Sequence, residues 1–262
     1  KTADINIPVL ATIPNAASGR TKPATGWPVV IFQHGITGNR THALAVSATL
    51  AAQGFAVVAI DLPLHGLPSD SPFAIGNTPF GAIASERTFD VDYVNNASGA
   101  PGQDGIADSS GTHFINLSSL LTSRDNLRQA VADLFVLTAT LPSLDIDGNG
   151  TGDFDSSRMQ FVGLSLGAIV GTSFLALEPN VNVGMLSAPG GGIARLLDGS
   201  ATFGPRIRAG LAASGVQAGT PTYDSFMGAA QQVIDSIDPV NYGFASAQNA
   251  ILLHEVVGDG AA

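Results

Sequence analysis

Short, continuous apolar segments alternate with helical patterns through much of the chain. Residues 27–33 and 55–62 are almost wholly apolar, and residues 40–53 between them repeat Ala and Leu at helical spacing before Gly54. Continuous apolar segments of this length are typical of strands buried on both faces of a parallel sheet. A strand, a helix and a second strand in this order predict a βαβ unit.

The same patterns predict most of the remaining elements. They are an edge strand over residues 4–13, helices over 119–141 and 166–177, a strand that begins at Met159, and strands over 181–186 and 250–257. We expect one domain over residues 1–262 that carries two insertions. Residues 67–118 have no helical or strand period and are predicted to form a lid or substrate wall, with a merely decorative insertion as the alternative. Residues 191–236 are predicted to form a helical cap of two or three short helices.

The amino-acid composition excludes several classes of function for this protein. Hydrophobic residues make up 45% of the 262 residues, which is enough for a full core. Lys and Arg number 11 against 21 Asp and Glu, and the net charge of −10 argues against binding to nucleic acid or to anionic membranes. The absence of cysteine excludes disulfides and thiol catalysis. No apolar segment approaches the roughly 20 residues of a transmembrane helix.

A candidate nucleophile lies between the strand that begins at Met159 and the helix over 166–177. Gly163-Leu-Ser165-Leu-Gly167 matches the pattern Gly-x-Ser-x-Gly. In that pattern the serine occupies a strained turn between strand and helix, and the flanking glycines remove Cβ atoms that would clash there. The sequence therefore predicts Ser165 as a nucleophile. The alternative is a glycine-rich turn with a structural serine.

Two backbone N–H groups are candidates for an oxyanion hole. The helix that begins at Leu166 leaves its first N–H groups free, so that of Leu166 can donate to a developing oxyanion. The turn His34-Gly-Ile-Thr-Gly38 follows another strand at the same edge of the sheet, and we expect the N–H of Ile36 to be the second donor. The alternative is a plain connection. We interpret His34 as a structural brace and His65 as a loop histidine.

An acidic segment precedes the strand that begins at Met159. In Asp145-Ile-Asp-Gly-Asn-Gly-Thr-Gly-Asp153, oxygen ligands fall at the first, third, fifth and ninth positions of the EF-hand loop template. The expected ligands are Asp145, Asp147, Asn149, Thr151 through its carbonyl, and Asp153. Position twelve is Ser156 rather than Glu, although Asp155 is adjacent. The segment thus predicts a structural calcium ion, with a solvated acidic turn as the alternative. No cofactor is expected to be required for catalysis.

The order of these motifs resembles the α/β-hydrolase fold over nearly the whole chain. The matching segments are His34-Gly-x-x-Gly, Gly54-Phe-x-Val-Val-x-x-Asp, Gly163-x-Ser-x-Gly, and the apolar strand followed by Gly258-Asp. Residues 86–95 and 123–130 further resemble bacterial extracellular lipases and esterases of the virulence-factor lipase group. That resemblance implies export to the cell surface, the periplasm or the medium, and some relatives cleave polyesters.

In the α/β-hydrolase fold the acid and then the histidine of a catalytic triad follow the serine along the chain. Asp259 is the best candidate for the acid, ahead of Asp238 and Glu255, although the acid of such proteins often lies a few residues further on. No histidine follows Asp259, and His254, His42 and His113 are poorly placed. We therefore expect that a last strand and helix are missing, and that a further segment or a separate C-terminal fragment carries the histidine and perhaps the acid.

The sequence as a whole predicts a serine carboxylic ester hydrolase of the carboxylesterase or lipase type. The apolar insertions and the scarcity of basic residues favour a small-molecule, lipid or polyester ester as the substrate. Two alternatives stay open: a non-catalytic module of the same fold that binds an apolar ligand, and a peptidase of the same fold.

Overall fold

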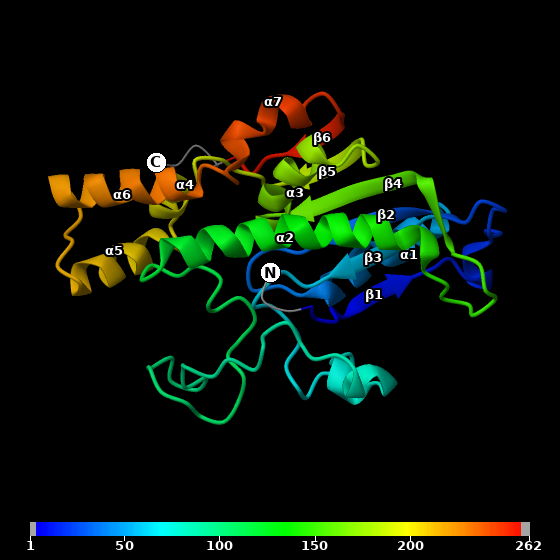
Figure 1. Cartoon of the computed structure of the whole chain (residues 1–262), viewed down its shortest axis with the longest axis horizontal. Coiled ribbons are helices and arrows are strands. Elements are labelled where there is room, and N and C mark those ends of the chain that lie inside the picture. Colours follow the sequence, from blue (N-terminus) through cyan, green and yellow to red (C-terminus); the bar gives the residue numbers. More distant parts are fainter. Residues whose placement is uncertain (1–3, 258–262) are drawn as a thin grey trace.

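The computed structural model describes residues 4–257, which form a six-stranded sheet with helices on both faces (Figure 1). The strands are β1 (Val9–Thr12), β2 (Trp27–Gln33), β3 (Ala56–Ile60), β4 (Phe154–Leu164), β5 (Val183–Ser187) and β6 (Ala250–His254). Their order across the sheet is β1-β3-β2-β4-β5-β6. β1 pairs with β3 in antiparallel orientation, and all other neighbours are parallel. The predicted mostly parallel sheet is confirmed.

The longer helices cover the sheet from both sides. α1 (Leu44–Ala52) packs on one face, where Val46 and Leu50 meet Val57 and Ala59 of β3. α2 (Leu120–Thr140) and α3 (Leu166–Leu177) cover the other face (Figure 1). These two helices contact each other through Phe135 and Phe174, whose ring centroids are 5.8 Å apart. Residues along β2 and β3 alternate between the two faces, as the period of a strand requires.

The segment over residues 191–236 contains three helices, as the sequence predicted. They are α4 (Ile193–Gly199), α5 (Gly204–Ala213) and α6 (Pro221–Ile234), and they extend beyond the end of the sheet beside the first turns of α2 (Figure 1). Their apolar faces share a small core of their own, built around Ile207, Leu211 and Met227. α7 (Gly243–Ser246) then leads into β6.

The segment over residues 67–118 is mostly irregular and projects from one side of the molecule (Figure 1). It contains two short 3-10 helices, Ile75–Asn77 and Pro79–Ala82, and one isolated bridge between Val94 and Pro101. Whether it acts as a lid stays a prediction. No helix among residues 4–257 combines the length and the apolar character needed to cross a bilayer.

Candidate active site

Ser165 occupies the turn between β4 and α3 in a strained backbone conformation with a positive φ. Its φ is 52° and its ψ is −116°, values that a residue with a side chain rarely adopts. The N–H of Ser165 donates to the carbonyl of Ser187 at 2.8 Å, and the Ser165 carbonyl accepts the N–H groups of Ala168 and Ile169. The turn is therefore fixed from both sides, by the neighbouring strand and by the first turn of α3.

The glycines around Ser165 allow a close approach of backbone segments. A Cβ on Gly163 would lie 2.6 Å from the Gly167 carbonyl oxygen, and a Cβ on Gly167 would lie 2.2 Å from that of Gln33. A Cβ on Gly35 would lie 3.1 Å from Cβ of Ser165. Real Cβ atoms do not approach backbone oxygens as closely as 2.6 Å, so Gly163 and Gly167 allow this close packing of the backbone, and a side chain on Gly35 would crowd the serine.

The two expected oxyanion donors lie on the same cavity as Ser165. Leu166 is the first residue of α3, and its N–H is one of the groups that a helix leaves without an internal acceptor. Within residues 4–257 the N–H of Ile36 has no hydrogen-bond acceptor. Both residues line the cavity beside Ser165. The arrangement brings Ser165, Ile36 and Leu166 together, and their catalytic roles stay a prediction.

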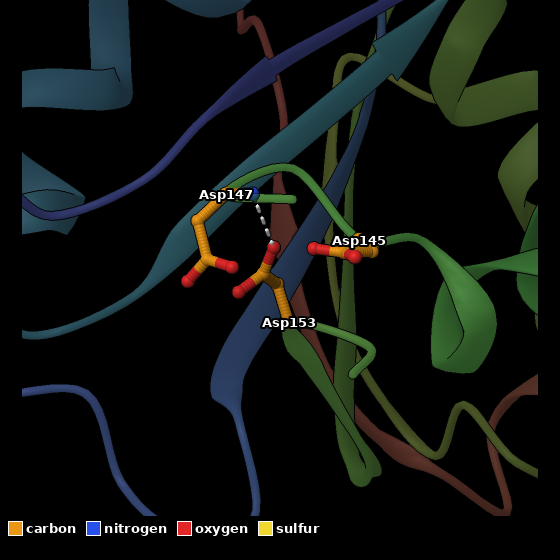
Figure 2. Close-up of side chains that lie close together, drawn as sticks. All are labelled: Asp145, Asp147 and Asp153. Atoms are coloured by element: carbon orange, nitrogen blue, oxygen red, sulfur yellow. Dashed lines mark hydrogen bonds between the residues drawn. The ribbon is translucent and has the colours of Figure 1, made fainter. Parts of the chain in front are cut away.

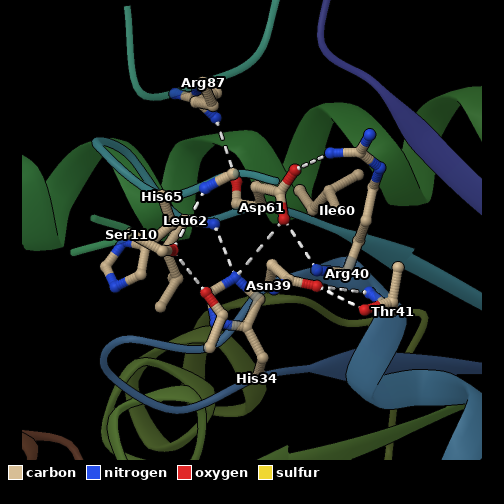
Figure 3. A network of polar contacts seen from close by, with 12 residues as sticks. His34, Asn39, Arg40, Thr41, Ile60, Asp61, Leu62, His65, Arg87 and Ser110 are labelled. Atoms are coloured by element: carbon tan, nitrogen blue, oxygen red, sulfur yellow. Dashed lines mark hydrogen bonds and ion pairs between the residues drawn. The ribbon is translucent and has the colours of Figure 1, made fainter. Parts of the chain in front are cut away.

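Residues 35–38, here called the oxyanion loop, form a tight turn. The N–H of Gly38 donates to the Gly35 carbonyl at 3.0 Å. His34 lies just before the loop and is fully buried, with Nδ1 donating to the Gly35 carbonyl at 2.8 Å and Nε2 accepting the N–H of Leu62 at 3.1 Å (Figure 3). Burial lowers the pKa of His34 to about 4, so the ring is neutral at pH 7. Both ring nitrogens are engaged with backbone groups, as expected for a brace.

A cavity of about 980 Å³ opens at Ser165 and runs beneath the helical segment. Apolar side chains from α2, α4, α5 and α6 form most of its lining, and Phe114 and Ile115 contribute from the end of the 67–118 insertion. The one charged residue that lines it within residues 4–257 is Arg195. A large apolar cavity with a few polar groups at one end is the usual form of a small-molecule site.

No histidine in the part of the chain that the structure describes hydrogen-bonds to Ser165, although all five lie within residues 4–257. His254 of β6 pairs with Ser187 of β5, and its Nδ1 lies 2.9 Å from Ser187 Oγ. Because adjacent strands are about 4.8 Å apart, this position two strands away from β4 is roughly 10 Å from the nucleophile strand. His113 contacts Asp108, and His42 is exposed.

The expected acid, Asp259, lies outside the described residues. The carboxylate of Asp238, the weaker candidate, is buried and accepts the N–H groups of Gly192 and Ile193 at 2.8 and 2.7 Å, where α4 begins. It also accepts hydrogen bonds from Nε2 of Gln231 and from the N–H of Val240, both at 2.9 Å. Asp238 thus caps a helix that lines the cavity, and its oxygens are occupied by these contacts.

The predicted calcium loop brings three carboxylates together. Asp145, Asp147 and Asp153 place ligand oxygens within 4.8 Å of one another (Figure 2). Asn149 and Thr151 lie in the same loop, where the side-chain oxygen of Asn149 accepts the N–H of Thr151 at 2.9 Å. Carboxylate oxygens are the type of ligand that a hard cation such as calcium takes, and the three carboxylates supply part of the roughly six to eight oxygens that calcium binds.

A cation from another part of the chain already contacts this loop. Nζ of Lys22 hydrogen-bonds to Asp153 and lies 3.2 Å from Asp147. Asp145 accepts the N–H groups of Gly148 and Gly150, both at 2.7 Å. Lys22 and backbone N–H groups therefore already contact these carboxylates, and calcium binding stays a prediction.

A buried ionic network at the ends of β2 and β3 was not expected from the sequence. Arg40 contacts both Asp61 and Glu86. Arg87 lies 2.6 Å from Asp133 of α2, and its Nη1 also donates to the Asp61 carbonyl. Figure 3 shows the contacts that Arg40 and Arg87 make with Asp61. Glu86 and Arg87 belong to the 67–118 insertion. The network therefore fastens the insertion to the loop after the oxyanion turn and to α2. The one signal in the sequence was the resemblance of residues 86–95 to an esterase motif.

Comparisons with known proteins agree with this architecture. The sequence model of the family described as platelet-activating factor acetylhydrolase, isoform II, matches residues 9–63, which run from β1 to the end of β3. A comparison with curated proteins finds no match. Among solved structures, an acetyl xylan esterase from Paenibacillus sp. R4 has a TM-score of 0.54 at 14% identity, and the match covers 98% of this chain and 76% of that chain.

Two further esterase structures match less closely. Acetyl xylan esterase 1 from Thermoanaerobacterium sp. JW/SL YS485 has a TM-score of 0.49 at 17% identity, covering 92% of this chain and 73% of that chain. A ferulic acid esterase from Streptomyces cinnamoneus has a TM-score of 0.39 at 16% identity, covering 64% of this chain, and the match spans 38% of its own length. The strand order, the serine turn and the match at a TM-score of 0.54 show that this chain has the fold of the α/β-hydrolase superfamily.

Proposed function

We propose that this protein is a serine ester hydrolase in which Ser165 is the nucleophile. The observation that carries the proposal is the position of Ser165, in a strained turn with a positive φ at an apolar cavity that Ile36 and Leu166 also line. The names of similar proteins give support, because an acetyl xylan esterase shares the fold and an acetylhydrolase family matches residues 9–63.

In the proposed reaction Ser165 Oγ attacks the ester carbonyl carbon. The carbonyl oxygen becomes an oxyanion, and the N–H groups of Leu166 and Ile36 donate to it. Loss of one such donor costs about 3 kcal/mol of transition-state stabilisation. The proton that leaves the Ser165 hydroxyl passes through a general base to the leaving oxygen, so the tetrahedral intermediate expels the alcohol and leaves an acyl group on Ser165. Water then attacks the acyl-enzyme and gives one proton back to Ser165 as the acid is released. We assign the general base to none of the five histidines, and Asp259 stays the proposed acid.

The cavity favours esters with a large apolar part. Its volume of about 980 Å³ lies at the upper end of small-molecule sites, which run to about 1,000 Å³, and its lining is almost wholly apolar. We propose lipid-like acyl esters as the substrates, with polyester chains as a second class. The finer assignment to the virulence-factor lipase group and the export of the protein from a bacterial cell also stay proposals, supported by residues 86–95 and 123–130 and by the composition.

A fluorophosphonate probe combined with a series of p-nitrophenyl esters tests the nucleophile. The protein should acquire one adduct at Ser165, and Ser165→Ala should lower ester hydrolysis by at least about 1,000-fold. Ser118→Ala, which removes an exposed serine hydroxyl, is the matched control and should keep both activities. If the native protein neither reacts with the probe nor cleaves esters, the ligand-binding module becomes the better account. Cleavage of peptides in preference to esters would favour a peptidase.

A bulky residue inside the cavity tests the substrate class. Ile207 is buried on α5 and lines the cavity, whereas its neighbour Arg206 is exposed and does not. Ile207→Trp should lower the activity on long-chain esters while leaving the acetate ester unaffected, because only long chains reach α5. Arg206→Trp adds the same ring outside the cavity and should leave the chain-length profile unchanged. Equal loss on all chain lengths would show that acyl chains do not enter this cavity.

A further inference from the structure

The end of the 67–118 insertion packs into the space between the two loops that follow β2 and β3. We propose that Ser110, Gly111 and His65 are positioning residues that hold the oxyanion loop in its reactive shape. The insertion would then act on the chemical step in addition to lining the cavity. This inference rests on the proposed function, because it assigns the three residues to the donor that Ile36 supplies.

The oxyanion loop needs outside support, because its backbone is strained. Thr37 has a φ of 63° at the third position of the turn that the Gly38 N–H closes on the Gly35 carbonyl. A positive φ at this position is normally supplied by glycine or asparagine, and it is an outlier for a β-branched residue such as threonine. Such conformations persist where the surroundings over-determine them.

His65 supplies one of these supports from the loop after β3. Its Nδ1 donates to the Pro63 carbonyl at 2.8 Å, which leaves Nε2 unprotonated to accept the Thr37 N–H at 3.3 Å. The ring is fully buried and meets the Phe114 ring edge-on at 5.3 Å. Because His65 takes the N–H of Thr37, that group is not available to an oxyanion, whereas the neighbouring N–H of Ile36 has no acceptor within residues 4–257.

Ser110 supplies a second support from the insertion. Its Oγ donates to the Gly38 carbonyl at 2.6 Å and accepts the N–H of Gly66 at 3.1 Å. One hydroxyl thus joins three segments: the oxyanion loop, the loop after β3 and the insertion. Figure 3 shows Ser110 beside His65 and His34.

Gly111 fits the remaining space so closely that no side chain is possible. A Cβ at this position would lie 2.4 Å from Nε2 of His65 and 2.9 Å from the backbone nitrogen of Thr37. The N–H of Gly111 donates to the Leu64 carbonyl at 2.9 Å, and this hydrogen bond holds residue 111 in place against the loop after β3. The hydrogen bond between His65 and Thr37 therefore survives only while residue 111 is glycine.

A purely structural role for these contacts and a positioning role predict different kinetics. A structural role would lower stability or expression and leave kcat unchanged in the folded fraction. A positioning role lowers kcat at nearly constant KM, because an oxyanion donor acts in the transition state. A displacement of about 1 Å in a catalytic group is enough to cost about 100-fold in rate.

The sharpest test compares two glycines of the same insertion. Gly111 and Gly105 have φ values of 78° and 80°, but a Cβ on Gly105 would meet nothing within 4 Å. Gly111→Ala and Gly105→Ala thus impose the same backbone strain, and only the first pushes on His65 and Thr37. We expect Gly111→Ala to lower kcat between 10- and 100-fold, because a catalytic group displaced by about 1 Å costs about 100-fold in rate. Gly105→Ala should keep kcat within about twofold of the wild type.

Two milder changes keep the proposal falsifiable if Gly111→Ala fails to fold. Ser110→Ala should lower kcat, whereas Ser109→Ala, on the exposed neighbouring residue, should not. His65→Leu should lower kcat, and His65→Gln should recover part of it, because its amide oxygen can accept the Thr37 N–H. Unchanged kcat in folded Ser110→Ala and His65→Leu would overturn the proposal.

The wild type and Ser165→Ala are measured in the same assay, so failure of the proposed function and failure of the positioning role give different results. Absence of ester hydrolysis by the native protein, or its persistence in Ser165→Ala, would refute the proposed function. Hydrolysis that depends on Ser165 but is indifferent to Ser110 and His65 would refute this inference alone.

Discussion

Arg40 and Glu86 form a bidentate ion pair in which each terminal nitrogen of the guanidinium lies 2.7 Å from one carboxylate oxygen. The pair joins the segment after the oxyanion loop to the insertion. Glu86 also accepts the N–H groups of Leu67 and Ile75, at 3.1 and 2.7 Å. One largely buried carboxylate therefore organises the start of the insertion around Arg40.

Removal of the Glu86 carboxylate should destabilise the protein strongly. Burial alone would raise the pKa of Glu86, but the Arg40 guanidinium and the two N–H groups keep it below its usual range. Glu86→Ala leaves the buried Arg40 short of a partner and should cost about 3 kcal/mol of unfolding free energy. Asp125→Ala, which removes an exposed ion pair with Arg124, is the control and should have little effect. Chemical denaturation gives both values, and equal unfolding free energies would contradict the prediction.

The sequence predicts the sheet and the serine turn well, because both depend on local patterns. The apolar segments at residues 27–33 and 55–62 became β2 and β3, and the helix predicted over 166–177 has those bounds in α3. β4 begins at Phe154, five residues before the apolar segment that starts at Met159, because Phe154 pairs with Trp27 at the start of β2. The glycines on either side of the serine allow the close approach of backbone segments that a Gly-x-Ser-x-Gly motif implies.

The supports of the site could not be predicted in the same way. Ser110 reaches the Gly38 carbonyl across 72 residues of sequence, and Lys22 reaches the acidic loop across 125. Such contacts follow from how irregular segments pack, and no period in the sequence encodes them. Ser165, Ile36 and Leu166 were predicted to meet because parallel strands end at one edge of a sheet. No comparable rule identifies the general base, and none of the five histidines hydrogen-bonds to Ser165.

Two substitutions at Ser165 should separate backbone strain from chemistry. Ser165→Ala and Ser165→Gly both remove the hydroxyl, so both should abolish reaction with a fluorophosphonate. Because φ at this position is 52°, alanine keeps the steric cost of the left-handed region and glycine relieves it. Ser165→Gly should therefore be more stable than Ser165→Ala by about 1 kcal/mol. Thermal denaturation of the two variants measures the difference, and a less stable glycine variant would show that the turn is not strained.

A methyl group at Gly167 should separate α3 from β2. Its Cβ would lie 2.2 Å from the Gln33 carbonyl oxygen and 2.7 Å from that oxygen's carbon, and backbone atoms cannot move aside cheaply. Gly167→Ala should destabilise the protein by at least about 2 kcal/mol and abolish activity. Gly228→Ala on α6 is the matched control, because its Cβ meets nothing within 4 Å and alanine favours a helix by about 0.5–1 kcal/mol. An increase in stability for Gly228→Ala beside a loss for Gly167→Ala would support the close approach.

The buried histidines make stability fall at mildly acidic pH. Burial, the first cause for both, lowers the pKa of His34 and of His65 from 6.5 to about 4, and His34, Asp61 and Arg87 are the charged or titratable neighbours of His65. Between pH 6.5 and 4 the unfolded chain binds more protons than the folded one, so stability is full above pH 6.5 and is lost as the pH falls towards 4. Urea midpoints at several pH values measure this slope. His65→Gln should flatten it.

The acidic loop offers a final test, in which calcium competes with a lysine of the same chain. Asp145, Asp147 and Asp153 stay our proposed calcium ligands. Burial alone would raise the pKa of Asp153, but the Lys22 ammonium and the N–H groups of Ile146 and Asp147 keep it low. The Asp153 carboxylate is therefore charged at pH 7 and already has one cationic partner.

Calcium has to displace that partner from Asp147 and Asp153, so Lys22→Met should bind calcium more tightly than the wild type. Without calcium the variant leaves the buried Asp153 carboxylate without its ammonium, and its melting temperature should fall. Calcium chloride should restore the melting temperature of Lys22→Met and raise that of the wild type less, because the ion binds the folded loop alone. Asp147→Asn in the Lys22→Met background removes a ligand charge and should weaken the rescue. If calcium and EDTA give the same melting temperatures for the wild type and Lys22→Met, the calcium prediction is wrong and Lys22 alone neutralises the loop.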